Sequence, residues 1–115
     1  MKIALAQLNY HIGNFQENNQ KIIESIKKAE NLDVDLIVFA ELAISGYPPR
    51  DFLEFKDFVE KCMSSAEKIA AHCTKTAAII GTPIFNQSEK GKPLFNSAAF
   101  LADGKIQHYT HKTLL

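Results

Sequence analysis

The chain has 115 residues, of which 46% are hydrophobic and 23% are charged, and its 13 Lys and Arg residues balance 13 Asp and Glu residues. This length and composition predict one globular domain or part of one. The zero formal net charge gives no support for binding to nucleic acid or to a membrane surface. No apolar run approaches the length of a membrane span, and the first residues lack the features of a signal peptide, so we expect a cytoplasmic protein.

Apolar periodicity predicts that strands and helices alternate along the first half of the chain. Residues 3–8 are typical of a strand, and Asn14 is placed to cap a helix over about residues 15–30. The continuous apolar run over residues 36–40 predicts a strand that is buried on both faces. Adjacent prolines predict a loop over residues 47–51.

The same alternation continues in the second half. Apolar residues at helical spacing predict a helix over about residues 54–73. An apolar run over residues 77–81 predicts a strand that Pro83 stops, and a polar segment over residues 86–93 predicts a surface loop.

A hairpin is predicted at the C-terminal end, where residues 95–101 and 106–113 are strand-like and Asp103-Gly104 is a turn signal. The whole order predicts an α/β fold with a parallel or mixed sheet. Because two helices can cover only one face of such a sheet, we expect the other face to be covered by something outside these residues.

The cysteines and histidines do not predict a metal site. Cys62 and Cys73 are eleven residues apart, lack a CxxC pattern and share the apolar side of the predicted helix, which predicts buried, inert thiols. The four histidines show no metal-ligand spacing, so a structural or surface role is favoured for each. They are His11, His72, His108 and His111.

The most informative segment is residues 36–53, in which an apolar run ends at Glu41 and a Gly and two prolines then turn the chain. α/β enzymes place a general base at such a strand end. The alternative is an ordinary strand-end carboxylate that pairs with a nearby Lys or Arg. Lys112 lies near the end of the last predicted strand, and its position alone favours a solvated lysine. If the sheet brings it beside Glu41, the pair could deprotonate a nucleophile and stabilise an oxyanion.

Motifs for nucleotide binding and for serine hydrolysis are absent from the sequence. It contains no GxGxxG, no GxxxxGK[ST] and no GxSxG motif. Direct evidence for dinucleotide or triphosphate binding, or for a nucleophile elbow, is therefore lacking within these residues.

Together these segments resemble the N-terminal part of the nitrilase, or carbon–nitrogen hydrolase, superfamily, whose members use a Glu-Lys-Cys triad. The Glu follows a buried strand in a segment like Phe39-Ala40-Glu41-Leu42, and the Lys lies in a segment like His111-Lys112-Thr113-Leu114-Leu115. The separation of 112 − 41 = 71 residues fits, and residues 1–9 and 95–98 are also similar to segments of the family. The resemblance implies the first part of an α-β-β-α sandwich, with a mixed sheet and helices on one face.

Residues 45–53 are similar to a loop of the glutamine-dependent NAD synthetases. In that subgroup an N-terminal glutaminase domain hydrolyses glutamine and passes ammonia to a synthetase domain, which uses ATP and magnesium to amidate deamido-NAD. The resemblance implies that Glu41 is the general base, that Lys112 stabilises the tetrahedral intermediate and that Tyr47 lines the glutamine pocket. It implies no cofactor within this segment.

The family's nucleophilic Cys lies some tens of residues beyond the Lys. The resemblance therefore implies that residues 1–115 form an incomplete glutaminase domain, inactive alone, with no second domain. It also implies a homo-oligomer. Two alternatives remain: a stand-alone small-amide amidase of the same superfamily, and a non-catalytic α/β binding or scaffold module that is complete at Leu115.

Overall fold

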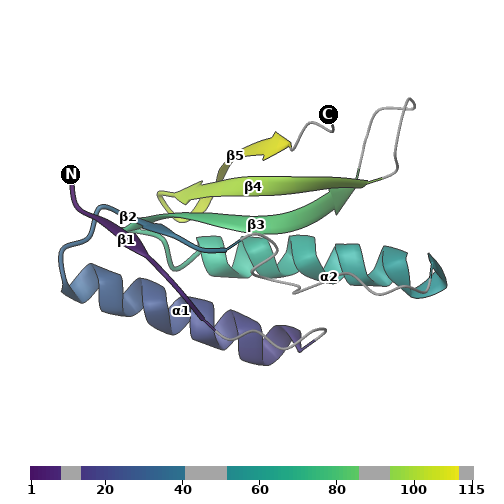
Figure 1. Cartoon of the computed structure of the whole chain (residues 1–115), viewed down its shortest axis with the longest axis horizontal. Coiled ribbons are helices and arrows are strands. Elements are labelled where there is room, and N and C mark those ends of the chain that lie inside the picture. Colours follow the sequence, from purple (N-terminus) through teal and green to yellow (C-terminus); the bar gives the residue numbers. More distant parts are fainter. Residues whose placement is uncertain (9–13, 41–51, 86–93, 112–115) are drawn as a thin grey trace.

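The computed structural model describes residues 1–8, 14–40, 52–85 and 94–111 (Figure 1). The elements in chain order are β1 (Ile3–Leu5), α1 (Phe15–Asn31), β2 (Leu36–Val38), α2 (Phe52–Ala70), β3 (Ala77–Phe85), β4 (Leu94–Ala102) and β5 (Lys105–His111). This order confirms the predicted alternation of strands and helices and the predicted hairpin.

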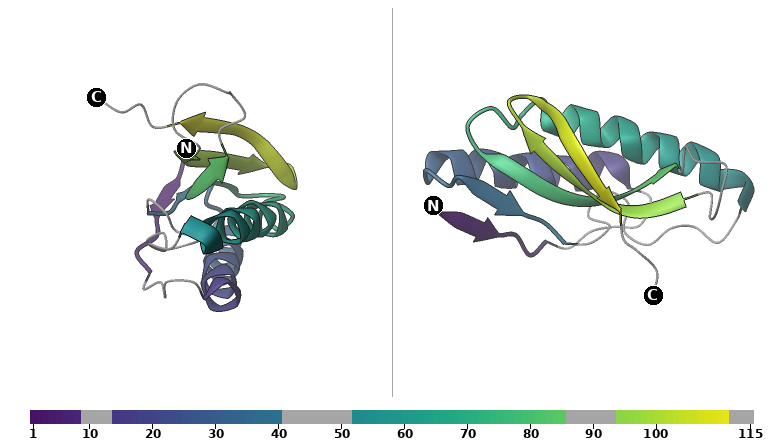
Figure 2. Two further views of the ribbon diagram at one scale, coloured as in Figure 1. Left: turned by 90° about the vertical axis from the view of Figure 1, so that its right-hand side faces the viewer. Right: turned by 90° about the horizontal axis from the view of Figure 1, so that it is seen from above.

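The five strands form one mixed sheet in the order β1-β2-β3-β4-β5. The first three strands are parallel, and β4 and β5 are each antiparallel to the strand before them. Both helices lie on the same side of the sheet (Figures 1 and 2). The predicted α/β fold, with a mixed sheet and helices on one face, is therefore confirmed.

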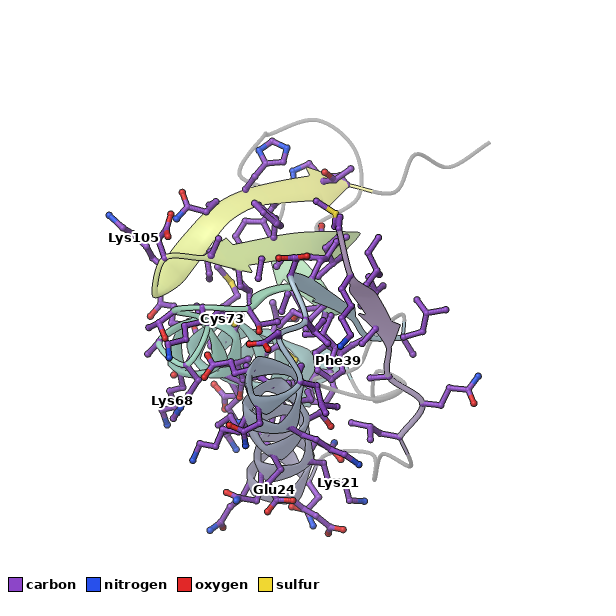
Figure 3. The ribbon with its side chains drawn as sticks, turned by 90° about the vertical axis from the view of Figure 1, so that its left-hand side faces the viewer. Lys21, Glu24, Phe39, Lys68, Cys73 and Lys105 are labelled. Carbon is purple, nitrogen blue, oxygen red and sulfur yellow. The ribbon has the colours of Figure 1, made fainter. Side chains whose placement is uncertain are left out.

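The core lies between the sheet and the two helices. Ile22 and Ile26 of α1 and Ile69 of α2 are fully buried there, as are Ile80 and Leu101 from the strands. Each such side chain stabilises the fold by about 1.5–3 kcal/mol relative to leaving it in water. In Figure 3 this inner layer holds Phe39 and Cys73, whereas the charged side chains labelled on α1 and α2 extend away from it.

The start of α1 follows the predicted capping chemistry. The Asn14 side-chain oxygen accepts a hydrogen bond from the Glu17 backbone N–H at 3.1 Å, and the Asn14 amide donates to the Glu17 carboxylate at 2.9 Å. This arrangement satisfies one of the backbone donors that every helix leaves unpaired at its first turn.

Several predicted boundaries were wrong. β1 ends at Leu5 and β2 at Val38, before the predicted residues 8 and 40. The helix α2 begins at Phe52 rather than residue 54 and ends at Ala70 rather than residue 73. Its last turn tightens, because the backbone N–H groups of His72 and Cys73 bond three residues back at 3.0 and 2.9 Å.

The sequence predicted that Pro83 stops strand β3. In the structure β3 runs through Pro83 to Phe85. The N–H and C=O groups of a strand residue point to the same side, and successive residues alternate. Ala77 and Ile79 bond toward the β2 side, so position 83 also faces that side. The ladder with β2 ends at Ile79. The missing N–H of Pro83 therefore costs no bond to β4, which explains why a proline fits here.

The β4–β5 connection is the predicted two-residue hairpin. Asp103 and Gly104 have φ angles of 55° and 79°, and the flanking residues Ala102 and Lys105 pair with each other. Positive φ at both turn positions matches the right-handed twist of the two strands. A β-bulge between Phe100 and Leu101 then shifts the register of the ladder.

The face of the sheet opposite the helices exposes large apolar side chains. Ile3, Leu5 and Phe100 are 54%, 78% and 39% exposed. Their strand neighbours Ala4 and Leu101 belong to the helix side, which places the three exposed residues on the opposite face. The predicted uncovered face is thus present in the described part of the chain.

Candidate functional site

One edge of the sheet collects the carboxyl ends of several strands. β1, β2 and β3 run in the same direction, and two antiparallel steps return β5 to that direction (Figure 1). In open α/β sheets, ligands bind outside the carboxyl ends of the strands. This edge is therefore the candidate site.

A row of polar residues crosses this edge on three neighbouring strands. Thr82 of β3 pairs with Ser97 of β4, and Ser97 pairs with His111 of β5. Thr82 is fully buried and Ser97 is 5% exposed, while His111 is exposed. The Ser97 hydroxyl and His111 Nδ1 are 2.8 Å apart, so a hydrogen bond joins the two strands where β5 ends.

The end of β2 lies at the same edge. The Phe39 N–H donates to the Ile79 carbonyl at 2.9 Å, which extends contact with β3 one residue past the strand. Phe39 is buried against the core, and Ala40, the next residue, is exposed. The chain thus leaves the core at position 40.

The three residues predicted to act on the substrate all lie outside the described residues. They are Glu41, Tyr47 and Lys112. The structure does describe Ala40 and His111, the residues immediately before Glu41 and Lys112, and both lie at the carboxyl edge. The roles of Glu41, Tyr47 and Lys112 stay predictions. The loops predicted over residues 47–51 and 86–93 also lie outside the described part.

The two cysteines are buried, as predicted. Cys62 lies within α2, and Cys73 lies just after it. Burial, helped by the nearby charge of Glu30, raises the pKa of the Cys73 thiol to about 12. Its Sγ donates a long hydrogen bond to the Ile69 carbonyl at 3.7 Å. Because the thiolate is the nucleophilic form, Cys73 is inert at neutral pH.

The described histidines are exposed, and two of them lie on strand β5. His72 is exposed after the end of α2 rather than within the helix, and His108 is exposed on β5. His108 pairs with Phe100 and His111 with Ser97, so the two histidines face opposite sides of the sheet. Within residues 1–8, 14–40, 52–85 and 94–111, no group of three His, Cys, Asp or Glu side chains could hold a metal ion.

A groove of about 540 Å³ lies in the helical layer rather than at the sheet edge. It is lined by α1 and α2, and its charged groups are Lys61 and Lys68, with no carboxylate. Asn19 lies in it and donates to the Ser65 hydroxyl at 2.9 Å. Since no lining residue could act as a general base at neutral pH, this groove is not a candidate hydrolytic site.

The chain was compared with known families and proteins. The family model described as carbon-nitrogen hydrolase matches residues 2–115. The chain belongs to the carbon-nitrogen hydrolase family. This confirms the superfamily resemblance that the sequence indicated.

Relatives and solved structures refine this assignment. The chain is 38% identical over 117 residues to a glutamine-dependent NAD(+) synthetase of Synechocystis sp., covering 98% of this chain and 21% of that protein. The structure of a glutamine-dependent NAD+ synthetase from Acinetobacter baumannii, in complex with ADP, matches with a TM-score of 0.79 and 37% identity, covering 98% of this chain and 21% of that chain.

A more distant structure shares the fold. A mutant of the Nesterenkonia AN1 amidase from the nitrilase superfamily matches with a TM-score of 0.77 and 22% identity, covering all of this chain and 44% of that one. The chain spans about one fifth of the length of the curated relatives it matches. In the described part of this carbon-nitrogen hydrolase, neither helix combines the length and apolarity needed to cross a membrane.

Proposed function

We propose that this chain is part of the glutamine amidase domain of a glutamine-dependent NAD synthetase, and that residues 1–115 form an incomplete amidase domain. The domain would hydrolyse glutamine and supply ammonia for the amidation of deamido-NAD. Relatives that are 34–38% identical over nearly the whole chain and carry that description support the assignment.

The observation that carries the proposal is the register at the carboxyl edge. Val38 pairs with Ile79, and Thr82 lies three residues further along β3. Ala40, the residue before Glu41, follows β2, and His111, the residue before Lys112, ends β5. Thr82 pairs with Ser97, and Ser97 pairs with His111, so the three residues lie side by side across β3, β4 and β5. Consecutive Cα atoms are about 3.8 Å apart, so Glu41 and Lys112 each begin one step beyond the edge.

The span between these two positions suits a shared substrate. β2 and β5 are separated by three strand spacings of about 4.8 Å each, or about 14 Å between backbones. The side chains of Glu and Lys each reach several ångströms from their Cα atoms. A small amide placed between them could therefore meet a carboxylate on one side and an ammonium group on the other.

In the proposed mechanism Glu41 accepts the thiol proton of a Cys that lies outside this chain. The thiolate attacks the side-chain amide carbon of glutamine, and Lys112 stabilises the negative charge that develops on the amide oxygen. Glu41 then returns the proton to the departing ammonia. Water hydrolyses the remaining thioester, and Tyr47 lines the pocket that holds glutamine.

ATP and magnesium belong, in this proposal, to a synthetase domain outside the chain. Residues 1–8, 14–40, 52–85 and 94–111 contain no group of three His, Cys, Asp or Glu side chains that could hold a metal ion. The partners are glutamine, the remainder of the synthetase and further copies of it in a homo-oligomer. The expected compartment is the cytoplasm.

The decisive test is Glu41→Gln in the full-length synthetase. We expect this substitution to abolish NAD synthesis supported by glutamine and to spare synthesis supported by ammonia, because ammonia bypasses the amidase chemistry. Loss of both activities would show that Glu41 is structural. Retention of both would show that Glu41 is not the base.

A second test uses the 115-residue chain alone. We expect it to hydrolyse no glutamine, because Cys62 and Cys73 are buried in the core and the chain contains no other cysteine. The assay should use purified material of confirmed mass, and measurable ammonia release would refute the proposed source of the nucleophile.

The second candidate is a stand-alone amidase of the same superfamily, which the shared fold with the Nesterenkonia amidase favours. Activity on other small amides, in a protein that lacks a synthetase domain, would support it. The non-catalytic α/β module would instead require a partner that covers the exposed face of the sheet.

A further inference from the structure

The hydrogen bond between Ser97 and His111 closes the β4–β5 ladder at the candidate site. The two residues form the last described pair of these strands, and their side chains meet at 2.8 Å. Ser97 is 5% exposed. A hydroxyl buried to this extent needs a partner, and the His111 ring supplies one. The contact thus joins a buried point of the sheet to the exposed end of β5.

The end of β5 lies at one edge of the described sheet, and β5 also contacts α2. β5 is the last strand of the described sheet and pairs with β4 alone. The bulge between Phe100 and Leu101 separates the pairs near the turn from those near His111. Strand ends with a neighbour on one side open readily. A side-chain bond at the final pair therefore has more effect on the strand's position here than it would in the middle of the ladder.

We propose that Ser97 and His111 act as a positioning pair, whose hydrogen bond fixes the end of β5 and so the backbone that leads into Lys112. The inference rests on the proposed function of Lys112. Neither residue is assigned contact with the substrate. A displacement of about 1 Å at a catalytic group can cost a large factor in rate, which is why such a bond matters for turnover.

The bond tolerates either protonation state of the imidazole. In the neutral ring, Nδ1 either accepts from the serine hydroxyl or donates to its oxygen, and in the charged ring Nδ1–H donates. The pair can therefore hold the strand without itself exchanging a proton during the reaction.

A Ser–His contact of this length is also the geometry of an activated nucleophile. Burial argues against that role, because Ser97 is 5% exposed and lies within a strand, paired with the fully buried Thr82. The two roles predict different outcomes. Removal of a nucleophile abolishes turnover, whereas removal of a positioning bond reduces it.

The test compares variants that keep or lose the bond in the full-length synthetase. In His111→Asn the amide nitrogen takes the place of Nδ1, whereas in His111→Gln it is one bond too far. We expect His111→Gln and Ser97→Ala each to lower kcat for glutamine hydrolysis about ten-fold with KM within about two-fold, as one hydrogen bond allows. His111→Asn and Ser97→Thr should stay close to wild type. The double variant Ser97→Ala/His111→Gln should be no worse than either single one.

The matched control is His108→Gln, which makes the same change on the same strand. His108 is exposed on the opposite face and pairs with Phe100. We expect it to leave kcat unchanged. Synthesis supported by ammonia should be unchanged in every variant, which separates a local effect from a loss of folding.

Three results would overturn the inference: equal effects of His111→Asn and His111→Gln, wild-type turnover in Ser97→Ala, or complete loss of turnover in Ser97→Ala. Glu41→Gln is measured alongside. If Glu41→Gln retains glutamine hydrolysis, the proposed function fails and the inference fails with it. If Glu41→Gln is inactive while His111→Gln is normal, the inference alone fails.

Discussion

The two faces of the sheet differ in how their apolar side chains are covered. On the helix side, Ile80 and Leu101 are fully buried beneath α1 and α2. On the opposite side, Leu5 is 78% exposed and Phe100, the direct neighbour of Leu101, is 39% exposed. The same strands thus supply two apolar faces, and only one of them is packed by described residues.

The described elements therefore complete one layer of packing, and the second apolar surface of the sheet stays exposed to solvent. Soluble proteins rarely leave a large continuous apolar patch in water. In the proposed α-β-β-α sandwich a second sheet would cover this face. Matched substitutions on the two faces of the sheet test this difference in packing.

The largest expected effect is on the covered face. Ile80→Ala should lower the free energy of unfolding of the 115-residue chain by about 2–5 kcal/mol, because it leaves a cavity under the helices. The matched control is Ile79→Ala, one residue away on the other face, where the side chain is only partly buried. Urea unfolding measures both, and equal losses would mean that the two faces are packed alike.

The burial of titratable groups on the covered face should also lower the free energy of unfolding at alkaline pH. The Cys73 pKa is raised from 9.0 to about 12, and burial and the charge of Glu67 raise that of Tyr109. The folded chain keeps these protons at a pH where the unfolded chain loses them, so stability is full below about pH 9 and falls above it.

For Cys73 we expect the free energy of unfolding to fall by about 1.4 kcal/mol per pH unit between the two pKa values. Unfolding of wild type and of Cys73→Ala, followed from pH 8 to pH 11, measures it. The substitution should flatten the curve above pH 9, and an unchanged slope would show that Cys73 does not carry the effect.

A smaller effect is expected at the start of α1, which helps to cover the helix side. Asn14→Ala should cost about 1 kcal/mol, because the Glu17 N–H loses its side-chain acceptor. Gln16→Ala, exposed in the same turn, is the control and should change stability little. A cost as large for Gln16→Ala would show that the loss does not come from the cap, because alanine favours the helix at least as much as glutamine does.

The smallest expected effect on stability is on the uncovered face. Leu5→Lys in the 115-residue chain should change the free energy of unfolding by less than about 0.5 kcal/mol, as for an exposed position. It should also reduce binding of a hydrophobic dye. In the full-length protein the same change should be clearly destabilising, because the proposed second layer would bury the charge. Equal effects in both proteins would contradict that layer.

Much of the fold was predictable, because strong local signals agree with the final packing. The capping pair at Asn14, the helical periodicity of α1 and the Asp103-Gly104 turn each specify local structure without help from distant residues. The prediction at Pro83 was wrong. A proline fits in β3 because β2 does not pair with β3 beyond Ile79, and the local sequence does not show where that pairing stops.

The chemistry of the site stays a prediction, and the contacts beside it could not be predicted from the sequence. Counting back from the turn would pair Ser97 with Thr110, because Ala102 pairs with Lys105. The bulge adds one residue to β5, and the observed partner is His111. No sequence signal marks this bulge, so the Ser97–His111 bond could not be foreseen. The roles of Glu41 and Lys112 come from the family resemblance, and activity assays must test them.

The most direct test of the central claim is to sequence the source transcript beyond codon 115. We expect the reading frame to continue to a Cys within some tens of residues and then to a synthetase domain with a phosphate-binding loop. A frame with the Cys but no second domain would leave a simple amidase. A stop codon directly after Leu115 would remove the nucleophile and contradict the proposed function.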